Sequence, residues 1–470
     1  MKSLFKLLPI FFFLAAMCTG RPVTANARSA ADGVVTFESG KQPGREIHVT
    51  TNGSDSSGDG SAARPYRSVD RAARDATPGT AIRIHAGTYT TRAYIENLAG
   101  TAAAPIWIGG APGEAKPVFR DASEGLHLSR VRYVVLHDIE VTRTGDNGIN
   151  TDDGGDYANA DATRYVVFRD LYIHDVGSSG NQDCLKLSGV NDYWVLRSEF
   201  ARCGGGSSGS GIDHVGCHHG LIVGNFFHDL SANAVQNKGG SEDIEMRANR
   251  MVNSGERSVN IGGSTSFDDF RPPLSSTQPN FEARNIRVIA NLIEGSIAPL
   301  AFVGAVDSLA ANNTIVNPEN WLLRILQETT GSGGYAFLAC GNNRVINNIF
   351  YFKRGDLSTH VNIGPNTDPA SFTFANNLWY ASDNPAQSQP SLPVSESSGL
   401  AGQNPLFAGI ASGNFQLQAG SPAIGRGTAL PGITHDYNGM AYNAPPSMGA
   451  FEANPPNLSQ RLYLPIARRQ

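Results

Sequence analysis

The feature that most constrains the fold of this chain is an internal repeat of alternating segments. Nine short stretches between about residues 132 and 380 each alternate apolar residues and then turn at a polar corner, as in "YVVLHDIEV" and "IRVIANLIE". A repeat unit of this length with a period of two predicts a solenoid of strands and not of helices. The corners lie 22 to 42 residues apart and are Asp138, Asp170, Ser198, Asn225, Asn249, Asn291, Asn313, Asn348 and Asn377.

A second set of segments fits the same coil. It comprises "GINTD", "CLKLSG", "GIDHVG", "AVQNKGG", "SVNIGG", "PLAFVG", "LLRILQ" and "HVNIG". Each coil therefore has at least two strands, and we expect a shorter third strand in the Gly- and Ser-rich inserts. Because Leu185, Leu187, Val235, Val259 and Ile261 alternate with polar residues, apolar side chains should line a central core. The Asn-rich corners are expected to form a stacked amide ladder with a structural role.

The two ends of the chain carry separate signals. Residues 1–27 combine Lys2 and Lys6, an apolar run and Ala25-Asn26-Ala27, which predicts a signal peptide and a secreted or cell-surface protein. Cys18 leaves a lipoprotein as the alternative. Residues 453–470 end in "RLYLPIARRQ", a candidate sorting or attachment signal that is too short to cross a bilayer.

Charge, hydropathy and cysteine content limit the partners, membrane segments and disulfides that we expect. Without residues 1–27, 34 basic residues face 42 acidic ones, which argues against nucleic acid as a partner. No later segment approaches the ~20 apolar residues of a transmembrane helix. We expect a monomer in which at least two of the four remaining cysteines are simply buried, and those four are Cys184, Cys203, Cys217 and Cys340.

These repeats resemble the pectate-lyase-like superfamily, which implies an all-β fold, a single-stranded right-handed parallel β-helix over residues 46–452. The opening "HVTTNGSDSSGDGSAARPYRSVDRAARDATPGTAIRIHAGTY" is similar to the first segment of secreted members. There "SVDRAARDA" would form an N-terminal capping helix whose Val69, Ala73 and Ala76 plug the solenoid. The stretch "DYNGMAYNAPPSMGAFE" resembles the closing segment that follows such helices.

Equivalent residues of neighbouring coils stack about 4.8 Å apart in such a fold, so alignment of the coils predicts which side chains meet. With the glycines in register, one outward row is Asn150, Lys186, Asp213, Gln236, Asn260, Ala301 and Arg324. The next is Asp152, Ser188, Val215, Lys238 and Gly262. We expect a polar groove here, with the inserts "GGGSSGSG" and "GGSTSFDDFRPP" as its rims. The alternative for Lys186 and Asp213 is an ion pair on a solvated face.

The region around Lys238 also resembles polysaccharide lyase family 6, whose catalytic lysine it matches in position. Where that family has Arg-His-Gly this chain has "NIGG", so Arg257 or Arg271 would have to supply the arginine. Similarity to family 9 implies a lysine base and a calcium site. Calcium is thus the one cofactor that the resemblance implies, with Asp183, Asp213 and Asp243 as its candidate ligands.

These residues and resemblances favour cleavage of an acidic, uronate-containing polysaccharide by β-elimination. Lys238 would remove the C5 proton, and an arginine or calcium would neutralise the substrate carboxylate. Lys186 and Asp213 complete the candidate catalytic set, and the candidate substrate-binding residues are Gln236, Asn260, Arg324 and His218. One alternative is a glycoside hydrolase that pairs Asp213 with Glu242 or Asp243. Another is a noncatalytic glycan-binding or surface protein.

Overall fold

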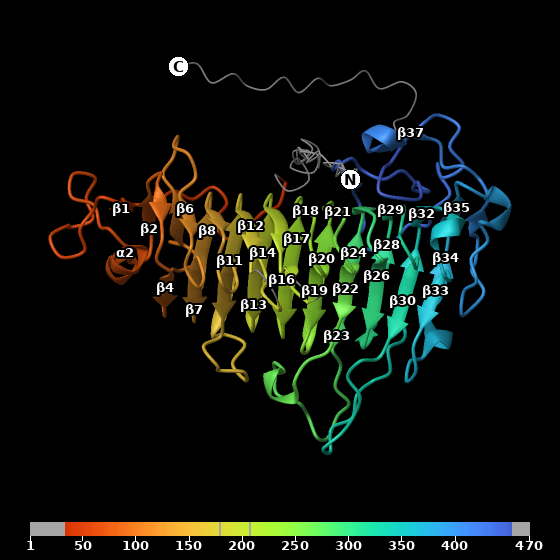
Figure 1. The fold of residues 1–470 in the computed structure, drawn as a ribbon, viewed down its shortest axis with the longest axis horizontal. Helices are drawn as coiled ribbons and strands as arrows, with labels where there is room; N and C mark the ends of the chain where they lie inside the picture. Colours follow the sequence, from red (N-terminus) through yellow and green to blue (C-terminus); the bar gives the residue numbers. More distant parts are fainter. Residues whose placement is uncertain (1–32, 178–179, 206–207, 454–470) are drawn as a thin grey trace, which may run out of the picture.

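Apart from those at the two ends, the coils contribute one strand to each of three parallel sheets, named A, B and C in the order in which the chain visits them (Figure 1). The computed structural model describes residues 33–177, 180–205 and 208–453. The predicted signal peptide, and the predicted tail apart from Ala453, lie outside the described residues. The described part is a right-handed parallel β-helix, as the repeat and the resemblance predict.

Sheet A is the longest of the three. Its strands are β1 (Arg45–Val49), β2 (Thr80–Ile84), β5 (Ile106–Gly110), β8 (Arg132–His137), β11 (Thr163–Arg169), β14 (Val190–Leu196), β17 (His218–Val223), β20 (Ser241–Arg247), β24 (Arg287–Ile289), β28 (Leu309–Ala311), β31 (Arg344–Ile346) and β34 (Thr373–Ala375), with β23 (Ala283–Arg284) and β27 (Ala305–Val306) beside them.

Sheet B consists of the short strands that follow the polar corners. They are β3 (Thr88–Tyr89), β6 (Val118–Arg120), β9 (Glu140–Thr142), β12 (Tyr172–Val176), β15 (Glu199–Cys203), β18 (Phe226–His228), β21 (Arg250–Val252), β25 (Leu292–Glu294), β29 (Thr314–Val316), β32 (Ile349–Phe352), β35 (Leu378–Ala381) and β36 (Leu400–Ala401).

Sheet C contains the second set of predicted segments. Its strands are β4 (Ala93–Glu96), β7 (Leu126–Ser129), β10 (Ile149–Asp152), β13 (Leu185–Ser188), β16 (Ser210–Val215), β19 (Asn233–Lys238), β22 (Arg257–Gly262), β26 (Ala298–Val303), β30 (Leu323–Leu326) and β33 (Val361–Ile363). A separate antiparallel hairpin joins β37 (Phe407–Gly409) to β38 (Asn414–Leu417).

The core is the column of inward side chains that the alternation predicts. Leu185, Leu187, Val235, Val259 and Ile261 are all fully buried in one hydrophobic cluster that runs the length of the solenoid. Helix α2 (Val69–Asp75) closes its N-terminal end, with a side-chain cap from Ser68. Its most deeply buried residues are Val69 and Ala72, whereas the predicted Ala73 and Ala76 are only partly buried against the core.

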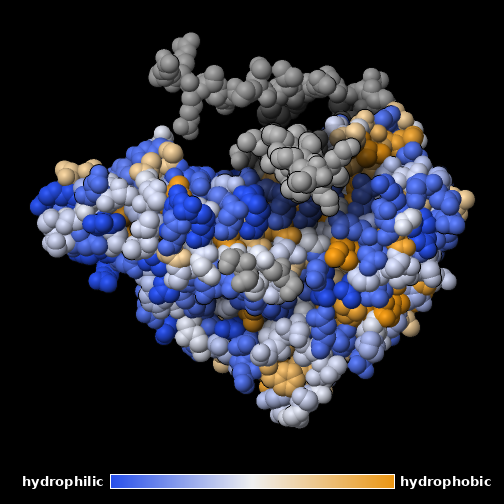
Figure 2. Space-filling view, in the orientation of Figure 1, coloured by the Kyte–Doolittle hydropathy of each residue, from blue (hydrophilic) through white to orange (hydrophobic). Residues whose placement is uncertain are grey.

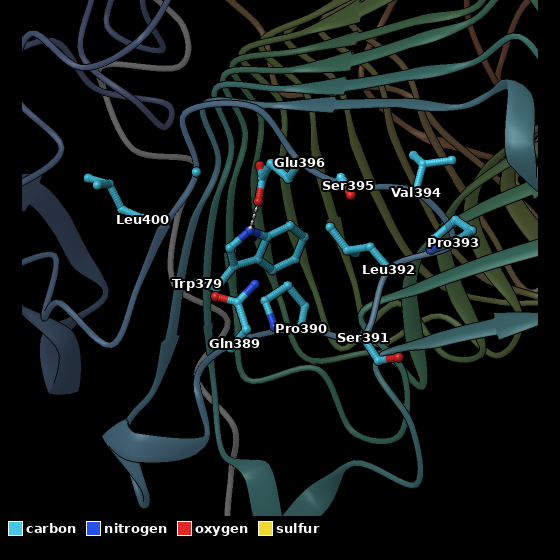
Figure 3. A pocket seen from close by; sticks show the side chains of 11 residues that line it. Trp379, Gln389, Pro390, Ser391, Leu392, Pro393, Val394, Ser395, Glu396 and Leu400 are labelled. Carbon is cyan, nitrogen blue, oxygen red and sulfur yellow. Dashed lines mark hydrogen bonds between the residues drawn. The ribbon is translucent and has the colours of Figure 1, made fainter.

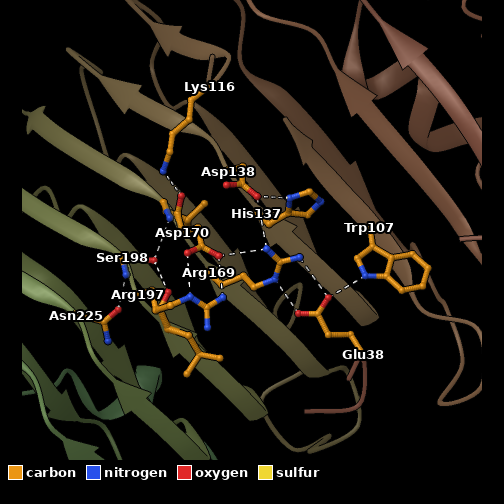
Figure 4. A network of polar contacts seen from close by, with 12 residues as sticks. Glu38, Trp107, Lys116, His137, Asp138, Arg169, Asp170, Arg197, Ser198 and Asn225 are labelled. Carbon is orange, nitrogen blue, oxygen red and sulfur yellow. Dashed lines mark hydrogen bonds and ion pairs between the residues drawn. The ribbon is translucent and has the colours of Figure 1, made fainter. Parts of the chain in front are cut away.

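The amide ladder is present from Ser198 onward. Each corner asparagine accepts hydrogen bonds at Oδ1 from the residue of the preceding coil, as when Asn291 accepts from both N and Nδ2 of Asn249 at 3.0 Å. Asp138 and Asp170 do not belong to it, contrary to the prediction. Because Arg169 pairs with Leu196, Asp170 lies level with Arg197. Leu171 occupies the ladder position and donates its N–H to Ser198 Oγ (Figure 4).

The last coil is closed by the segment that runs from β35 to β36. Glu396 in this segment terminates the ladder, since its Oε1 accepts from Asn377 Nδ2 at 2.7 Å and its Oε2 accepts from Trp379 Nε1 at 2.7 Å (Figure 3). The segment also bounds a cavity of about 710 Å³. Beyond it, Tyr437, Met448 and Phe451 of the predicted closing segment pack back along the outside of the solenoid.

The four cysteines among the described residues are all accounted for. Cys184 and Cys203 form a disulfide, and Cys217 and Cys340 are free and buried, as predicted for at least two of the four. Among the described residues no helix has the length and apolar character needed to cross a bilayer. Figure 2 shows a largely hydrophilic face on which hydrophobic residues gather toward the C-terminal end.

Candidate functional site

The first predicted outward row exists on sheet C, residue by residue. Register pairs link Asn150 to Lys186, Lys186 to Asp213, and onward through Gln236, Asn260 and Ala301 to Arg324. The row continues at both ends beyond what the alignment predicted. Tyr94 and His127 precede it, and Asn362 follows it.

The second predicted row is correct only as far as Lys238. Asp152, Ser188, Val215 and Lys238 are level with one another, but a register shift after Gln236 pairs Gly262 with Asn237 instead of Lys238. The shift explains why glycine occupies position 262: its φ is +101°, and a Cβ there would lie 1.8 Å from the carbonyl oxygen of Val303. Lys238 thus lies at the edge of the ladder next to a bulge, a place where side chains are often re-aimed.

The middle of sheet C carries a polar groove of about 380 Å³. Both predicted rims contribute to it, Ser208 from the first insert and Ser264 from the second. Four of the predicted site residues line this groove together: Lys238, Arg257, Gln236 and Asn260. The remaining lining residues are Asn181, Ala232, Asn233, Glu256 and Glu328.

Beneath this groove, two lysines share one buried carboxylate. Asp213 is 1% exposed, and its Oδ2 forms a close ion pair with Lys186 Nζ and lies 3.4 Å from Lys238 Nζ. Lys186 Nζ is also 3.6 Å from Oδ2 of the fully buried Asp183. The structure therefore brings Lys186, Asp213 and Lys238 into one cluster, as the alignment predicted.

The buried cluster shifts the protonation of its members. Burial by itself would raise the pKa of Asp213, but the positive charges of Lys186 and Lys238 outweigh it and hold that pKa below its usual range. Burial and the negative charge of Asp213 raise the pKa of Asp183 instead. For Lys186, burial opposes the charged form, but the two carboxylates outweigh this and raise its pKa.

Arg257 lies at the start of β22, opposite Lys238 along the groove. Its Nη1 donates to Asn260 Oδ1 at 3.1 Å and its Nη2 contacts Glu328 Oε1 at 2.9 Å. Its Nε is buried without a partner in the protein. The side chain is 13% exposed and lines the groove, so an anionic group there would reach the guanidinium in competition with Glu328.

Arg324 lies two strands beyond Asn260 in the same row. Its guanidinium stacks over the ring of Trp321 at 4.5 Å and its Nε donates to Asn362 Oδ1 at 3.0 Å. Burial and the nearby charge of Arg257 lower the pKa of Arg324. It therefore extends the positive surface of the groove toward the C-terminal end without lining the groove itself.

Two predicted site residues are placed elsewhere. Arg271 is buried beneath the turns that join sheets C and A, where its Nε donates to Asp153 Oδ2 at 2.6 Å and a Cβ on Gly216 would lie 2.3 Å from its own. His218 belongs to β17 of sheet A, and its two ring nitrogens contact Asn191 Oδ1 and the carbonyl of Gly240. The close packing and the saturated contacts of both side chains are those of structural residues.

The predicted calcium ligands do not converge. Asp243 lies on β20 of sheet A, where its Oδ1 accepts from Asn285 Nδ2 at 2.6 Å, whereas Asp183 and Asp213 lie at sheet C. Within the described ranges, no three acidic, histidine or cysteine side chains are grouped so that they could hold a metal ion. The position between Asp183 and Asp213 is occupied by the ammonium group of Lys186, so the residues present do not fit calcium.

The same topology separates the carboxylates proposed for a hydrolase. Glu242 lies on β20 and pairs with Arg284, and neither it nor Asp243 shares a sheet with Asp213. The groove does contain two other carboxylates, Glu256 and Glu328. Glu256 was not predicted as a site residue; it lies in the turn between β21 and β22, directly before Arg257.

Asn233 is a second lining residue that the sequence reasoning missed. It is level with Arg257 in the ladder, and its Nδ2 donates to Gln236 Oε1 at 3.0 Å. The signal that could have found it is this register, because extending the aligned segments by one residue toward the N-terminus places Asn233 beside Arg257. His214, by contrast, is fully buried and packs near Tyr193, as expected for a core histidine.

Comparison with known proteins supports the architecture. No protein-family model matches the chain, and no curated protein is detectably similar to it. Among solved structures, the pectate lyase Pel9A superposes with a TM-score of 0.53 at 19% identity, over 92% of this chain and 100% of that one. A rhamnogalacturonan lyase gives 0.44 at 13% identity over 74% and 90% of the two chains. A lacto-N-biosidase of family GH136 from Eubacterium ramulus gives 0.40 at 13% identity over 70% and 67%.

Proposed function

We propose that this chain, which has the pectate-lyase-like right-handed parallel β-helix fold, is a polysaccharide lyase that cleaves an acidic, uronate-containing glycan by β-elimination. The observation that carries the proposal is that Lys238 and Arg257 line the same polar groove on sheet C. One supplies an amine and the other a guanidinium, which are the two groups that proton abstraction next to a carboxylate requires.

In the proposed reaction, Lys238 Nζ takes the proton from C5 of a uronate residue. The electron pair of that C–H bond forms the C4–C5 double bond, the C4–O bond breaks, and the departing oxygen takes up a proton. A lysine acts as a base only in its neutral form. Lys186 pairs more closely with Asp213 than Lys238 does, so that carboxylate keeps a counter-ion when Lys238 is neutral.

Arg257 is proposed to neutralise the uronate carboxylate as negative charge builds on it during proton removal. Its guanidinium lines the groove and its ion pair with Glu328 is partly exposed, so a planar carboxylate can compete for it. Gln236 and Asn260 line the groove between the two cations, and Arg324 continues the row. Outward side chains that recur about every 4.8 Å along the solenoid can contact successive parts of an extended sugar chain.

A polymeric substrate is proposed because the groove is open and both inserts contribute to its lining. Two basic residues, Lys238 and Arg257, line it together with Glu256 and Glu328. We accordingly propose that the mature protein is secreted or held at the cell surface and acts as a monomer, with the N-terminal segment as its export signal.

The experiment that tests the proposal follows the ultraviolet absorbance of the unsaturated uronate that β-elimination creates. The mature protein is incubated with pectate, alginate, chondroitin and dermatan, and each reaction is repeated with Lys238→Ala. We expect a rise in absorbance on at least one polymer for the wild type and none for the variant. An equal rise for both proteins would remove Lys238 from the mechanism.

New reducing ends without unsaturated product would instead indicate hydrolysis. In that case Glu256 and Glu328 are the carboxylates that line the groove, and their substitution by glutamine would be the next test. Binding of a polymer with neither product would identify a noncatalytic glycan-binding protein.

A further inference from the structure

Two buried carboxylates lie near the Lys186 ammonium on neighbouring coils of sheet C, one just before a strand and one within the next strand. Asp183 is fully buried just before β13, and Asp213 is 1% exposed within β16. Asp183 Oδ1 accepts from the backbone N–H of Ser210 at 2.7 Å, which fixes its orientation toward the β16 side. Asp183 Oδ2 and Asp213 Oδ1 are buried without hydrogen-bond partners in the protein.

A pair of buried carboxylates is stable only if a positive charge compensates it. Here that charge is the ammonium group of Lys186, which is bonded to Asp213 Oδ2 and lies 3.6 Å from Asp183 Oδ2. Lys186 is held there by the strand itself, since it is level with Asp213 in the parallel ladder and three residues after Asp183. Its side chain is 18% exposed, so solvent reaches it only at one side.

We infer that the Lys186 ammonium is a built-in cation that takes the place of a metal in this site, and that the protein functions without calcium. The inference concerns the same groove as the proposed lyase and rests on that proposal for its consequence in catalysis. The position of the Lys186 ammonium between the two carboxylates does not depend on which reaction the groove performs.

Charge balance supports the inference. Asp183 and Asp213 contribute two negative charges, and Lys186 and Lys238 contribute two positive ones, so the cluster is neutral when all four are ionised. A calcium ion added to the cluster would bring two further positive charges into a region with little solvent. Calcium also takes six to eight oxygen ligands, and Asp243 is on another sheet.

The arrangement also gives the two lysines different tasks. Lys186 is bonded to Asp213 and close to Asp183, so it stays charged as a fixed counter-ion and acts as a positioning residue. Lys238 contacts Asp213 only at 3.4 Å and lines the groove, so its amine can exchange a proton with a substrate. The Lys186 ammonium, a permanent cation beside the proposed base, neutralises the buried carboxylates as a bound metal ion would.

The test measures calcium binding directly and needs no substrate. Wild-type protein, first freed of metal with EDTA, is titrated with calcium chloride in a calorimeter, and its thermal unfolding is followed with calcium and with EDTA. We expect no binding heat and the same Tm in both conditions, up to roughly 10 mM calcium. Saturable binding that Asp213→Asn or Asp183→Asn abolishes would overturn the inference, whether or not the protein proves to be a lyase.

A matched pair of variants sharpens the test. Lys186→Asp replaces the ammonium by a third carboxylate, and Lys353→Met removes an exposed lysine outside the cluster. We expect Lys186→Asp to gain a calcium-dependent rise in Tm of roughly 5 °C at saturating calcium, and Lys353→Met to gain none. A folded Lys186→Asp protein that is indifferent to calcium would contradict the inference. If that substitution prevents folding, the wild-type titration decides alone.

Discussion

Two charged regions of this solenoid, one on sheet A and one on sheet C, are built from the same residue types. They differ in how many of their buried polar atoms have hydrogen-bond partners. On sheet A, Glu38 of the N-terminal segment accepts from Arg169 Nε at 2.8 Å and from Trp107 Nε1 at 2.9 Å (Figure 4). Next to it, Arg197 donates two hydrogen bonds to Asp170, at 3.0 and 2.8 Å. The contacts of Glu38 with Arg169 and Trp107 hold the N-terminal segment around Glu38 against sheet A.

On sheet C, the cluster under the groove contains buried polar atoms without hydrogen-bond partners. Asp183 Oδ2, Asp213 Oδ1 and Arg257 Nε are buried and lack hydrogen-bond partners in the protein, whereas none of the five residues just described at sheet A has such an atom. Unmatched polar atoms are costly in a folded protein and tend to gather where a ligand completes them. The contrast is one of degree, since Arg250 Nε on sheet B is likewise buried without a partner, but among the described residues only the sheet C cluster combines such atoms with the groove that Lys238 and Arg257 line.

The largest expected difference between the two regions is in activity. Lys238→Ala should reduce the rate of polyuronate cleavage by about 10³-fold, because general-base catalysis contributes about 10²- to 10⁴-fold. Lys116→Ala, which removes a lysine that contacts the carbonyl of Asp170 in the sheet A network, should leave the rate nearly unchanged. The check is the initial rate of both variants on the same polymer, and similar losses in the two would erase the distinction.

The next largest difference is in stability. Asp213→Asn leaves two partly buried ammonium groups without their shared counter-ion, and we expect it to lower the free energy of unfolding by about 3 kcal/mol. Glu38→Gln, which keeps its hydrogen-bond acceptor for Trp107, should cost about 1 kcal/mol. Urea denaturation of both variants measures the pair, and a larger loss for Glu38→Gln would reverse the assignment.

A third prediction concerns pH and the N-terminal end of the outward row on sheet C. Burial disfavours the charged form of His127, but its hydrogen bonds to Asp152 and Glu124 outweigh this and raise its pKa to about 9. Because the pKa of His127 is higher in the folded state, its protonation stabilises the fold. This stabilisation is fully present below the unfolded pKa near 6.5 and is lost as the pH rises toward 9.

The wild type should therefore lose about 1–2 kcal/mol of stability between pH 6.5 and 9, allowing for partial exposure of the ring. His127→Gln should show a flatter dependence in that range. Unfolding midpoints at several pH values provide the measurement, and parallel curves for the two proteins would refute the role given to this histidine.

The smallest expected effect is on substrate affinity. Glu328 competes for Arg257 with any anionic ligand, at 2.9 Å from its Nη2. Glu328→Gln should lower KM for a polyuronate by about 2- to 3-fold with little change in kcat, because a partly exposed ion pair contributes about 0.5 kcal/mol. Glu294→Gln, which removes the partner of Arg250 on sheet B, is the matched control and should leave KM unchanged.

Much of this site followed from the repeat, and the errors have physical causes. Lys186, Asp213, Gln236 and Asn260 were placed correctly because parallel register alone decides which outward residues meet. The bulge after Gln236 could not be predicted, since it depends on how closely Gly262 approaches Val303. Arg271 lies in an insert, where the repeat fixes no position, and it does not line the groove; Glu256 lies in the turn before β22, lines the groove and was missed.

The corner residues show a subtler limit. Asp138 and Asp170 precede apolar residues where later coils have asparagine, so their polar corner is offset by one position from that of the ladder. Sequence similarity between corners could not reveal this offset, because an aspartate suits the left-handed turn position as well as a ladder position. Lys186 was correctly placed in the outward row, but its insertion between Asp183 and Asp213 depends on side-chain direction and emerged only from the structure.

The most direct test of the central claim is the mass of the products from a defined acidic oligosaccharide. β-Elimination splits the chain without adding water, so the account predicts two products whose masses sum to that of the substrate, and no products with Lys238→Ala. Products whose masses together exceed that of the substrate by one water would show hydrolysis and contradict the account.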